Sequence, residues 1–232
     1  MEQFKRTIML LGNEKFQKLY NSHVLVVGVG GVGGYVAEFL VRTGVDNITI
    51  VDQDVVDITN LNRQVIASHS TLNEPKVDAF KLRLLDINPK LNIKCIHERI
   101  SEKNCQQILL SDKFDYVIDA IDSTKDKINL ICQAKELNIP IISALGAGNR
   151  IGIPNYEIKD IYNTSDDGLA RVMRKALREH KIESLDVGIT NVKPVKPAVE
   201  NDAGQRNIGS LVYFPACLAA VISSFVVEKL TN

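Results

Sequence analysis

The sequence contains no C-x-x-C pair. Its four cysteines, Cys95, Cys105, Cys132 and Cys217, lie far apart along the chain. A structural zinc site usually takes closely spaced cysteine pairs, and a compact disulfide framework needs cysteines at regular spacings. The spacing therefore argues against zinc and against a disulfide-stapled fold. None of the four is a strong candidate nucleophile, because single cysteines in apolar or helical contexts are most often inert core residues.

An excess of charge of either sign is also missing. Lysine and arginine together number 28, and so do aspartate and glutamate, so the formal net charge is zero. Overall charge therefore indicates no nucleic-acid or acidic partner, and any basic surface has to be local. The N-terminal stretch MEQFKRTIMLLGNEKF lacks the uninterrupted apolar region of a signal peptide, which predicts a cytoplasmic protein.

One uncharged run, residues 208–227, has the length of a membrane-spanning helix, because about 20 helical residues match the ~30 Å bilayer core. Gly209, Pro215 and three serines within the run favour instead a strand or turn that leads into a buried core helix or dimer-interface helix. We therefore expect the run to be buried in the protein, with membrane association as the second interpretation.

The hydrophobic pattern is that of an α/β protein. With 232 residues, 45% of them hydrophobic, the chain is long enough to bury a sizeable core in one domain. Strand-like runs alternate with helix-length segments, which predicts a doubly wound, mostly parallel, Rossmann-like sheet. The expected strands cover residues 23–28, 47–52, 92–98, 116–122 and 139–146, and the expected helices include one opened by Pro75 and one over 124–137.

After about residue 150 this alternation changes. The remaining chain predicts a C-terminal α/β extension with strands over 155–162 and 185–192, a helix over 168–181 and a loop over 193–209. That loop has few apolar anchors, and we expect it to be disordered. We therefore divide the chain into a core, residues 1–150, and an extension of the same domain, residues 151–232, which we expect to bind substrate and to form a dimer interface.

The stretch VLVVGVGGVGG places a β-branched run directly before a cluster of glycines. Gly28, Gly30 and Gly33 have the G-x-G-x-x-G spacing of a nucleotide-binding loop, and Gly31 belongs to the same cluster. Glycines in such a loop allow a tight turn and let a phosphate group approach a helix N-terminus. The spacing alone does not distinguish NAD, FAD and ATP.

Residues further along the chain favour a triphosphate. Asp52 ends the second expected strand, where an acidic residue meets the ribose hydroxyls of NAD or ATP alike. Asn60 and Arg63 follow that strand, and Lys76 opens the next helix. Two cations and an amide exceed what a nicotinamide ribose needs. Taken singly, Lys76 could be a solvated first-turn lysine and Arg63 an ordinary ion pair.

Two carboxylates, Asp119 and Asp122, lie at the end of the fourth expected strand. A carboxylate at that edge can hold Mg²⁺, which prefers oxygen ligands and bridges phosphate oxygens. The structural alternative is that Asp122, followed by Ser123 and Thr124, caps the next helix.

Together these segments resemble the ThiF-type, ubiquitin-activating-enzyme-like adenylyltransferases. The resemblance covers roughly residues 4–150, through RTIMLLG, VLVVGVGGVGG, VDQDVVDITNLNRQ, EPKV and DAIDS in that order. It implies an ATP site in which Asp52 binds the ribose and Asp122 holds Mg²⁺. The residues that it implies at the phosphates are Asn60, Arg63 and Lys76. It further implies a homodimer in which Arg6 reaches the triphosphate bound to the other subunit.

Within that family the chain is most similar to the tRNA threonylcarbamoyladenosine dehydratases, through ISALGAGNR and the segment at 160–182. The resemblance implies ATP-dependent cyclisation of threonylcarbamoyladenosine in tRNA through an acyl-adenylate. Relatives that activate sulfur-carrier proteins usually have two C-x-x-C zinc pairs, which this chain lacks. Gly168 stands where a proline is common, and the loop over 193–209 matches poorly. A monovalent cation and a sulfur-transfer partner are left open.

A basic stripe is the expected trace of an RNA substrate. Four cations recur at i, i+3, i+4 and i+7, on one face of the helix expected over 168–181. They are Arg171, Arg174, Lys175 and Arg178. A charge run is usually a solvated face, and Glu179 and Glu183 could pair with part of it. Beside an adenylating site, we expect the stripe to contact the RNA backbone.

Three other functions remain open from the sequence. An activator of a ubiquitin-like sulfur carrier would use the same ATP site on the carboxylate of a peptide ending in Gly-Gly. An NAD-dependent oxidoreductase would explain the glycine loop but would give Asn60, Arg63 and Lys76 no purpose. A module that binds ATP without turnover would release no pyrophosphate.

Overall fold

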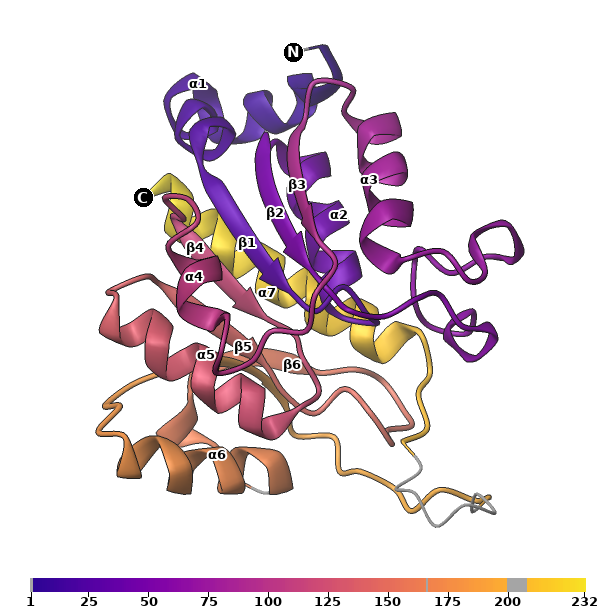
Figure 1. Cartoon of the computed structure of the whole chain (residues 1–232), viewed down its shortest axis with the longest axis vertical. Coiled ribbons are helices and arrows are strands. Elements are labelled where there is room, and N and C mark those ends of the chain that lie inside the picture. The colour runs from indigo at the N-terminus through magenta and orange to yellow at the C-terminus, as the bar shows by residue number, and fades with distance from the viewer. Residues whose placement is uncertain (1, 166, 200–207) are drawn as a thin grey trace.

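A seven-stranded β-sheet forms the centre of the molecule (Figure 1). The computed structural model describes residues 2–165, 167–199 and 208–232. The strands are β1 (His23–Val27), β2 (Asn47–Val51), β3 (Asn92–Ile96), β4 (Tyr116–Asp119), β5 (Ile141–Ala144), β6 (Tyr156–Asp160) and β7 (Asp186–Thr190). They lie in the order β3-β2-β1-β4-β5-β7-β6, and all neighbours are parallel except the antiparallel pair β7 and β6. The predicted mostly parallel, doubly wound sheet is confirmed.

Strand β1 is an interior strand of the sheet, between β2 and β4, and both of its faces are covered. Its HVLVV sequence is the nearly continuous aliphatic run of a buried parallel strand, and Val24 to Val27 have no exposed surface. Val24 is in register with Ile48 of β2 on one side and with Tyr116 of β4 on the other. The strand order reverses at β1, so the loops that follow β1 and β4 diverge and leave a crevice at the carboxyl ends of the strands.

Helices cover both faces of the sheet and enclose two hydrophobic cores. One face carries α1 (Lys5–Asn21), α2 (Gly33–Thr43), α3 (Lys76–Ile87) and α7 (Tyr213–Thr231). The other face carries α4 (Cys105–Leu109), α5 (Thr124–Glu136) and α6 (Gly168–Glu179). Short 3-10 turns occur at Glu2–Phe4, Ile58–Asn60, His69–Thr71 and Ile161–Asn163.

The sequence analysis assigned no helix to the segments that form α1 and α4. In α1 the pattern is obscured because Met9 and Leu10 are exposed and Gly12 interrupts the helix with a φ of 78°. Helix α4 is only five residues long, too short to show a helical period. The other predicted strands and helices are confirmed, with ends that differ by a few residues.

Helix α7 occupies most of the uncharged run noted in the sequence. By length and composition it is the one helix in the described part of the chain that could cross a membrane, and 44% of its most apolar window is buried. Leu218, Ile222 and Val226 recur every four residues and pack into the core between α2 and the sheet. Pro215 lies in the first turn, where a missing N–H is tolerated. This packing favours a core helix, and membrane contact stays a prediction.

The sheet continues across residue 150. Strands β6 and β7 join it beside β5, so the expected C-terminal extension shares the sheet of the core. Residues 193–199 and 208–209 of the loop expected to be disordered form no helix or strand, and its remainder, 200–207, lies outside the described residues.

Candidate active site

A pocket of about 540 Å³ lies in the crevice at the carboxyl ends of the strands. Clefts of this size accommodate small ligands and nucleotides. Most of the residues predicted to form a nucleotide site line it, although they come from five separate segments. They are Gly28, Gly30, Gly31, Asp52, Asn60, Arg63, Lys76 and Asp122.

The turn after β1 requires its glycines for two different reasons. Gly28 has a φ of 85°, and a Cβ there would lie 2.8 Å from the Ala120 carbonyl oxygen. A Cβ at Gly33 would lie 1.8 Å from the Gly28 carbonyl oxygen. Gly33 was predicted to contact the nucleotide, but it is not among the residues that line the pocket. Its role is to let the first turn of α2 pack against the loop.

Asp52 is held rigidly at the end of β2. Its Oδ2 accepts a hydrogen bond of 2.8 Å from the Val29 amide in the glycine loop. Its Oδ1 accepts a hydrogen bond of 2.8 Å from the Asp54 amide. The carboxylate therefore fixes the glycine loop to β2, and its remaining lone pairs are available to ribose hydroxyls.

Lys76 is buried rather than solvated, so the simpler interpretation of this residue is wrong. The residue is only 4% exposed, and Nζ lies 2.8 Å from Oδ2 of Asp54. Asp54 is itself half exposed at the pocket wall, and the sequence analysis did not single it out. An ammonium has three N–H donors, so Lys76 can keep this ion pair and also donate to a phosphate.

The segment after β2 brings an amide and a guanidinium to the pocket. Asn60 is 8% exposed, and its Oδ1 accepts from the Asp57 amide, which ties the side chain into a capping box. Arg63 Nη1 donates to the Thr59 carbonyl oxygen at 2.9 Å, so its anchor is a carbonyl rather than the carboxylate of an ordinary ion pair. Both side chains are thus oriented by their own turn.

Gln64 is a pocket residue that sequence reasoning missed. It is 7% exposed, and within the described chain its Oε1 has no hydrogen-bond partner. A buried amide oxygen without a partner is costly unless a ligand or water satisfies it. Its place directly after Arg63 was the only signal in the sequence.

The two aspartates at the end of β4 have different environments. Asp119 is fully buried, and its Oδ2 lies 2.8 Å from Lys127 Nζ and 2.6 Å from Ser143 Oγ. Burial raises the pKa of Asp119, and the Lys127 ammonium opposes that shift. Asp122 is exposed and lines the pocket. Ser123 caps α5, accepting from the Asp126 amide at 3.4 Å, so the capping interpretation of Asp122 is wrong.

A preformed metal centre is not needed for Mg²⁺ to bind beside a triphosphate. Within residues 2–165, 167–199 and 208–232, no group of three or more His, Cys, Asp or Glu side chains could hold a metal ion. Mg²⁺ characteristically takes one or two carboxylates together with phosphate oxygens and water. Asp122, which lines the pocket, can supply one such carboxylate.

Arg6 lies away from the pocket of its own chain. It is an exposed residue near the start of α1, and it does not line the pocket. Figure 1 shows the N-terminus and α1 beside the ends of β1 and β2 that lie away from their arrow tips. Arg6 is therefore not among the residues that would contact a nucleotide in the pocket of this subunit.

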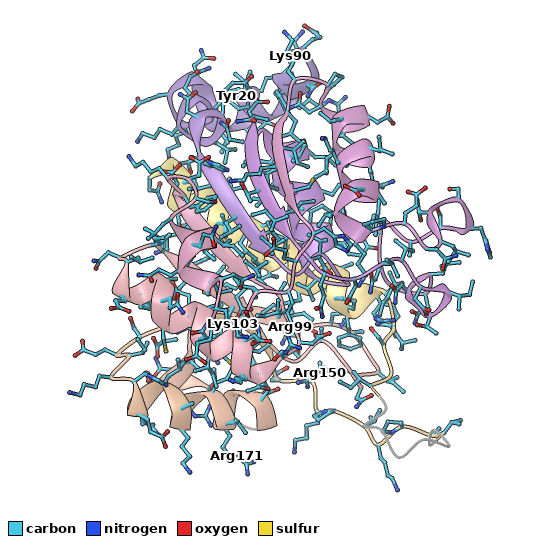
Figure 2. All side chains as sticks on the ribbon, viewed as in Figure 1. Tyr20, Lys90, Arg99, Lys103, Arg150 and Arg171 are labelled. Carbon is cyan, nitrogen blue, oxygen red and sulfur yellow. The ribbon has the colours of Figure 1, made fainter. Side chains whose placement is uncertain are left out.

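The four residues of the basic stripe on α6 fall into two pairs, one exposed and one in contact with other side chains of the protein. Arg171 and Lys175 are exposed. Arg174 donates to Thr164 Oγ1, and the Arg178 guanidinium carbon lies 5.2 Å from the centre of the Tyr162 ring. These partners replace the pairing with Glu179 and Glu183 considered from the sequence. No residue of the stripe lines the pocket, and Arg171 projects from the outer side of the molecule (Figure 2).

A buried ion pair connects α6 to the pocket. Arg150 and Asp167 have side chains only 3% and 8% exposed, with Nη2 and Oδ2 3.0 Å apart. Arg150 Nε also donates to the Gly146 carbonyl oxygen at 2.6 Å, and Asp167 Oδ1 caps α6 at the Ala170 amide. The sequence analysis assigned neither residue a role. The pair holds the start of α6 against the loop whose next residues, 147 and 148, line the pocket.

Three of the four cysteines, Cys95, Cys105 and Cys132, lack the properties of nucleophiles, and the fourth, Cys217, is exposed on α7 and does not line the pocket. Burial raises the pKa of Cys95 to about 11 and that of Cys105 to about 12. Burial also raises the pKa of Cys132. A thiol with a raised pKa carries little thiolate near neutral pH. The arrangement as a whole therefore suits binding and charge stabilisation of a phosphate chain more than thiol chemistry.

Comparisons with known proteins agree with this geometry. A family model described as the ThiF family matches residues 4–152. The chain is 42% identical over 183 residues to the tRNA threonylcarbamoyladenosine dehydratase of Bacillus subtilis, covering 79% of this chain and 72% of that one. It is 35% identical over 177 residues to the Escherichia coli protein of the same name, covering 76% and 66%. The crystal structure of that E. coli dehydratase, TcdA, in complex with ATP matches with a TM-score of 0.90 and 30% identity, covering 99% of this chain and 93% of that one.

Proposed function

The chain belongs to the ThiF family, and from this membership we propose that it is an enzyme that uses ATP to cyclise threonylcarbamoyladenosine in tRNA. The observation that carries the proposal is the pocket, which brings Asp52, Arg63, Lys76 and Asp122 around the glycine loop. The relatives named above as dehydratases of this nucleoside, one of them with ATP bound, support this substrate and reaction.

The pocket residues divide the binding of ATP among them. Asp52 receives the ribose hydroxyls, and the amides of the glycine loop face the phosphate groups. Arg63 and Lys76 offset the charge that develops as pyrophosphate separates. The Asn60 side-chain amide provides a further polar contact for the phosphate groups. Asp122 would hold Mg²⁺, which would supply positive charge beside the phosphate groups.

The reaction then follows in two steps. A carboxylate oxygen on the threonyl side chain attacks the α-phosphorus, the bond to the β-phosphate oxygen breaks, and pyrophosphate leaves. The carbamoyl group of the same side chain then attacks the acyl carbon, the ring closes, and AMP leaves. A well-oriented intramolecular nucleophile reaches an effective molarity of about 10⁵ to 10⁸ M, so no enzyme thioester is required. The raised pKa values of the buried thiols are consistent with this route.

We further propose that the enzyme works as a homodimer. Arg6 does not line its own pocket, and at a two-fold interface it can reach the triphosphate of the other subunit. Residues 1–150 then carry adenylation, and residues 151–232 carry tRNA binding and part of the dimer interface. A tRNA substrate favours a cytoplasmic enzyme.

The proposed function is tested by incubating the protein with ATP, Mg²⁺ and tRNA that carries threonylcarbamoyladenosine. We expect nucleoside mass analysis to show a product lighter by one water, with AMP and pyrophosphate formed in equal amount. A Lys76→Ala variant serves as the control for contaminating activity. If the tRNA is unchanged, and pyrophosphate appears only with a carrier protein that ends in Gly-Gly, the carrier-activating alternative is correct.

The basic stripe predicts how tRNA affinity depends on salt. Each phosphate contact contributes about −0.9 to the slope of log affinity against log salt on a duplex, by analogy with DNA, and about −0.7 on a single strand. Replacing Arg171 and Lys175 with glutamine should weaken tRNA binding and flatten that slope by roughly 1.4 to 1.8. The matched pair Arg174→Gln and Arg178→Gln should have the smaller effect, since both side chains have partners within the protein.

Filter-binding titrations over a range of salt concentrations measure both slopes, with ATP affinity as the control. ATP affinity should stay the same in both double variants, because the stripe does not line the pocket. If tRNA affinity and its salt dependence survive replacement of all four cations, the stripe is a solvated face.

A further inference from the structure

The pocket has two chemically different ends, one toward each face of the sheet. One end contains the glycine loop, Arg63 and Lys76, on the side of the sheet that carries α2 and α3. The other end lies toward α5 and the loop after β3, and it includes Glu98, Arg99 and Asp126. The following inference concerns this second end and rests on the proposed ATP-dependent function.

The second end is unsuited to phosphate groups. Two of its three ionisable side chains, Glu98 and Asp126, are carboxylates. Its floor contains the buried Ile100 together with Val51 and Ile121. With the ribose at Asp52 and the phosphates on the glycine-loop side, the group left to occupy this end is the uncharged, planar nucleobase.

Arg99 is held in one orientation at this end. Its Nε and Nη2 donate to the same Asp126 oxygen, Oδ2, at 3.0 and 2.7 Å. Asp126 is 8% exposed in the first turn of α5, and its amide is bound to the capping Ser123. Burial raises the pKa of Asp126, but the hydrogen bonds from Arg99 and Ser123 outweigh burial and lower it. Asp126 is therefore a firm ionic anchor for one edge of the guanidinium.

The rest of the guanidinium remains free to contact a ligand. The Arg99 side chain is 59% exposed and lines the pocket, and Figure 2 shows it near the tips of the strand arrows. A planar guanidinium packs well against the face of an aromatic ring, whereas an ammonium group lacks that flat surface. In nucleic-acid binding, stacking of this kind is possible with any base, because every base presents a π face.

We propose that Arg99 covers the nucleobase of bound ATP and contributes to its affinity by stacking, while Asp126 positions it. This assigns Arg99 to the base and leaves Arg63 and Lys76 to the phosphates.

Two substitutions separate stacking from charge. Arg99→Lys retains the positive charge beside Asp126 but loses the plane, and Arg99→Ala loses both. Calorimetric titration with ATP should show both variants weakened by about 3- to 30-fold. Inorganic tripolyphosphate, which has no base, should bind both variants and the parent protein equally. Lys103→Ala provides a matched control on the same loop, because Lys103 is exposed and does not line the pocket, and its ATP affinity should not change.

Either of two results would overturn the inference. If Arg99→Lys binds ATP as the parent does, the side chain acts through charge. If tripolyphosphate binding falls as much as ATP binding, Arg99 serves the phosphates. Arg99→Lys keeps a positive charge beside Asp126 and should keep the thermal melting temperature of the parent, whereas Arg99→Ala leaves that largely buried carboxylate without its partner and should melt at a lower temperature. A parent protein that binds ATP but leaves tRNA unchanged refutes the proposed function alone, and one that binds no ATP refutes both.

Discussion

Asp122→Ala is expected to lower ATP-dependent turnover by roughly 10²- to 10³-fold, the range for loss of one preorganised electrostatic group. The expectation follows from the place of Asp122 on the pocket wall, where its carboxylate can hold Mg²⁺ against the phosphates. Thermal stability should stay the same, because Asp122 is exposed and Ser123 provides the cap of α5. Pyrophosphate release and a melting curve measure the two effects.

Asp119→Asn is the matched substitution, only three residues away. It removes one partner of a buried ion pair and leaves Lys127 uncompensated, which typically costs about 3–5 kcal/mol. We therefore expect a large fall in the free energy of unfolding, as measured by urea titration. Unchanged turnover in Asp122→Ala would remove that residue from the site. Equal loss of stability in both variants would show that Asp122 is structural.

Mixing inactive Arg6→Ala and Lys76→Ala subunits is expected to restore about a quarter of the parent activity. Random exchange makes half of the dimers mixed, and each mixed dimer has one site with both lesions and one site with none. The physical reason is that Arg6 does not line the pocket of its own chain, while Lys76 is buried in the wall of that pocket.

The control for this experiment mixes Arg63→Ala with Lys76→Ala subunits. Both residues line the pocket of their own chain, so every mixed dimer carries one lesion in each site and no activity should return. Mass spectrometry of the intact dimers verifies exchange. Absence of recovery in the first mixture, with exchange verified, would show that Arg6 does not act across a subunit interface.

The sequence was sufficient for the sheet and for most of the pocket, for a physical reason. Asp52 follows the end of a strand, and Lys76 opens a helix. In a parallel sheet both kinds of position lie at the same edge, whatever the details of packing. Residues whose role depends on a partner distant in the sequence were not predictable in this way. Arg99 and Asp126 are 27 residues apart, and only the folded chain shows that one anchors the other.

The two aspartates of DAIDS show the same limit at shorter range. In sequence Asp119 and Asp122 are equivalent carboxylates after a strand. They differ because Lys127 and Ser143 donate hydrogen bonds to the carboxylate of Asp119 and not to that of Asp122. Helix α1 was not predicted because its apolar residues Met9 and Leu10 are exposed within a single subunit and so obscure the helical pattern of buried positions.

The buried pair formed by Arg150 and Asp167 has a consequence for how the molecule opens. One carboxylate both caps α6 and holds the guanidinium that binds the Gly146 carbonyl oxygen. The first turn of α6 therefore cannot fray without releasing the loop beside the pocket, and the loop cannot swing out without exposing the helix end. We therefore expect local opening of these two segments to be a single cooperative event, in which the first turn of α6 and the loop beside the pocket exchange their amide hydrogens together.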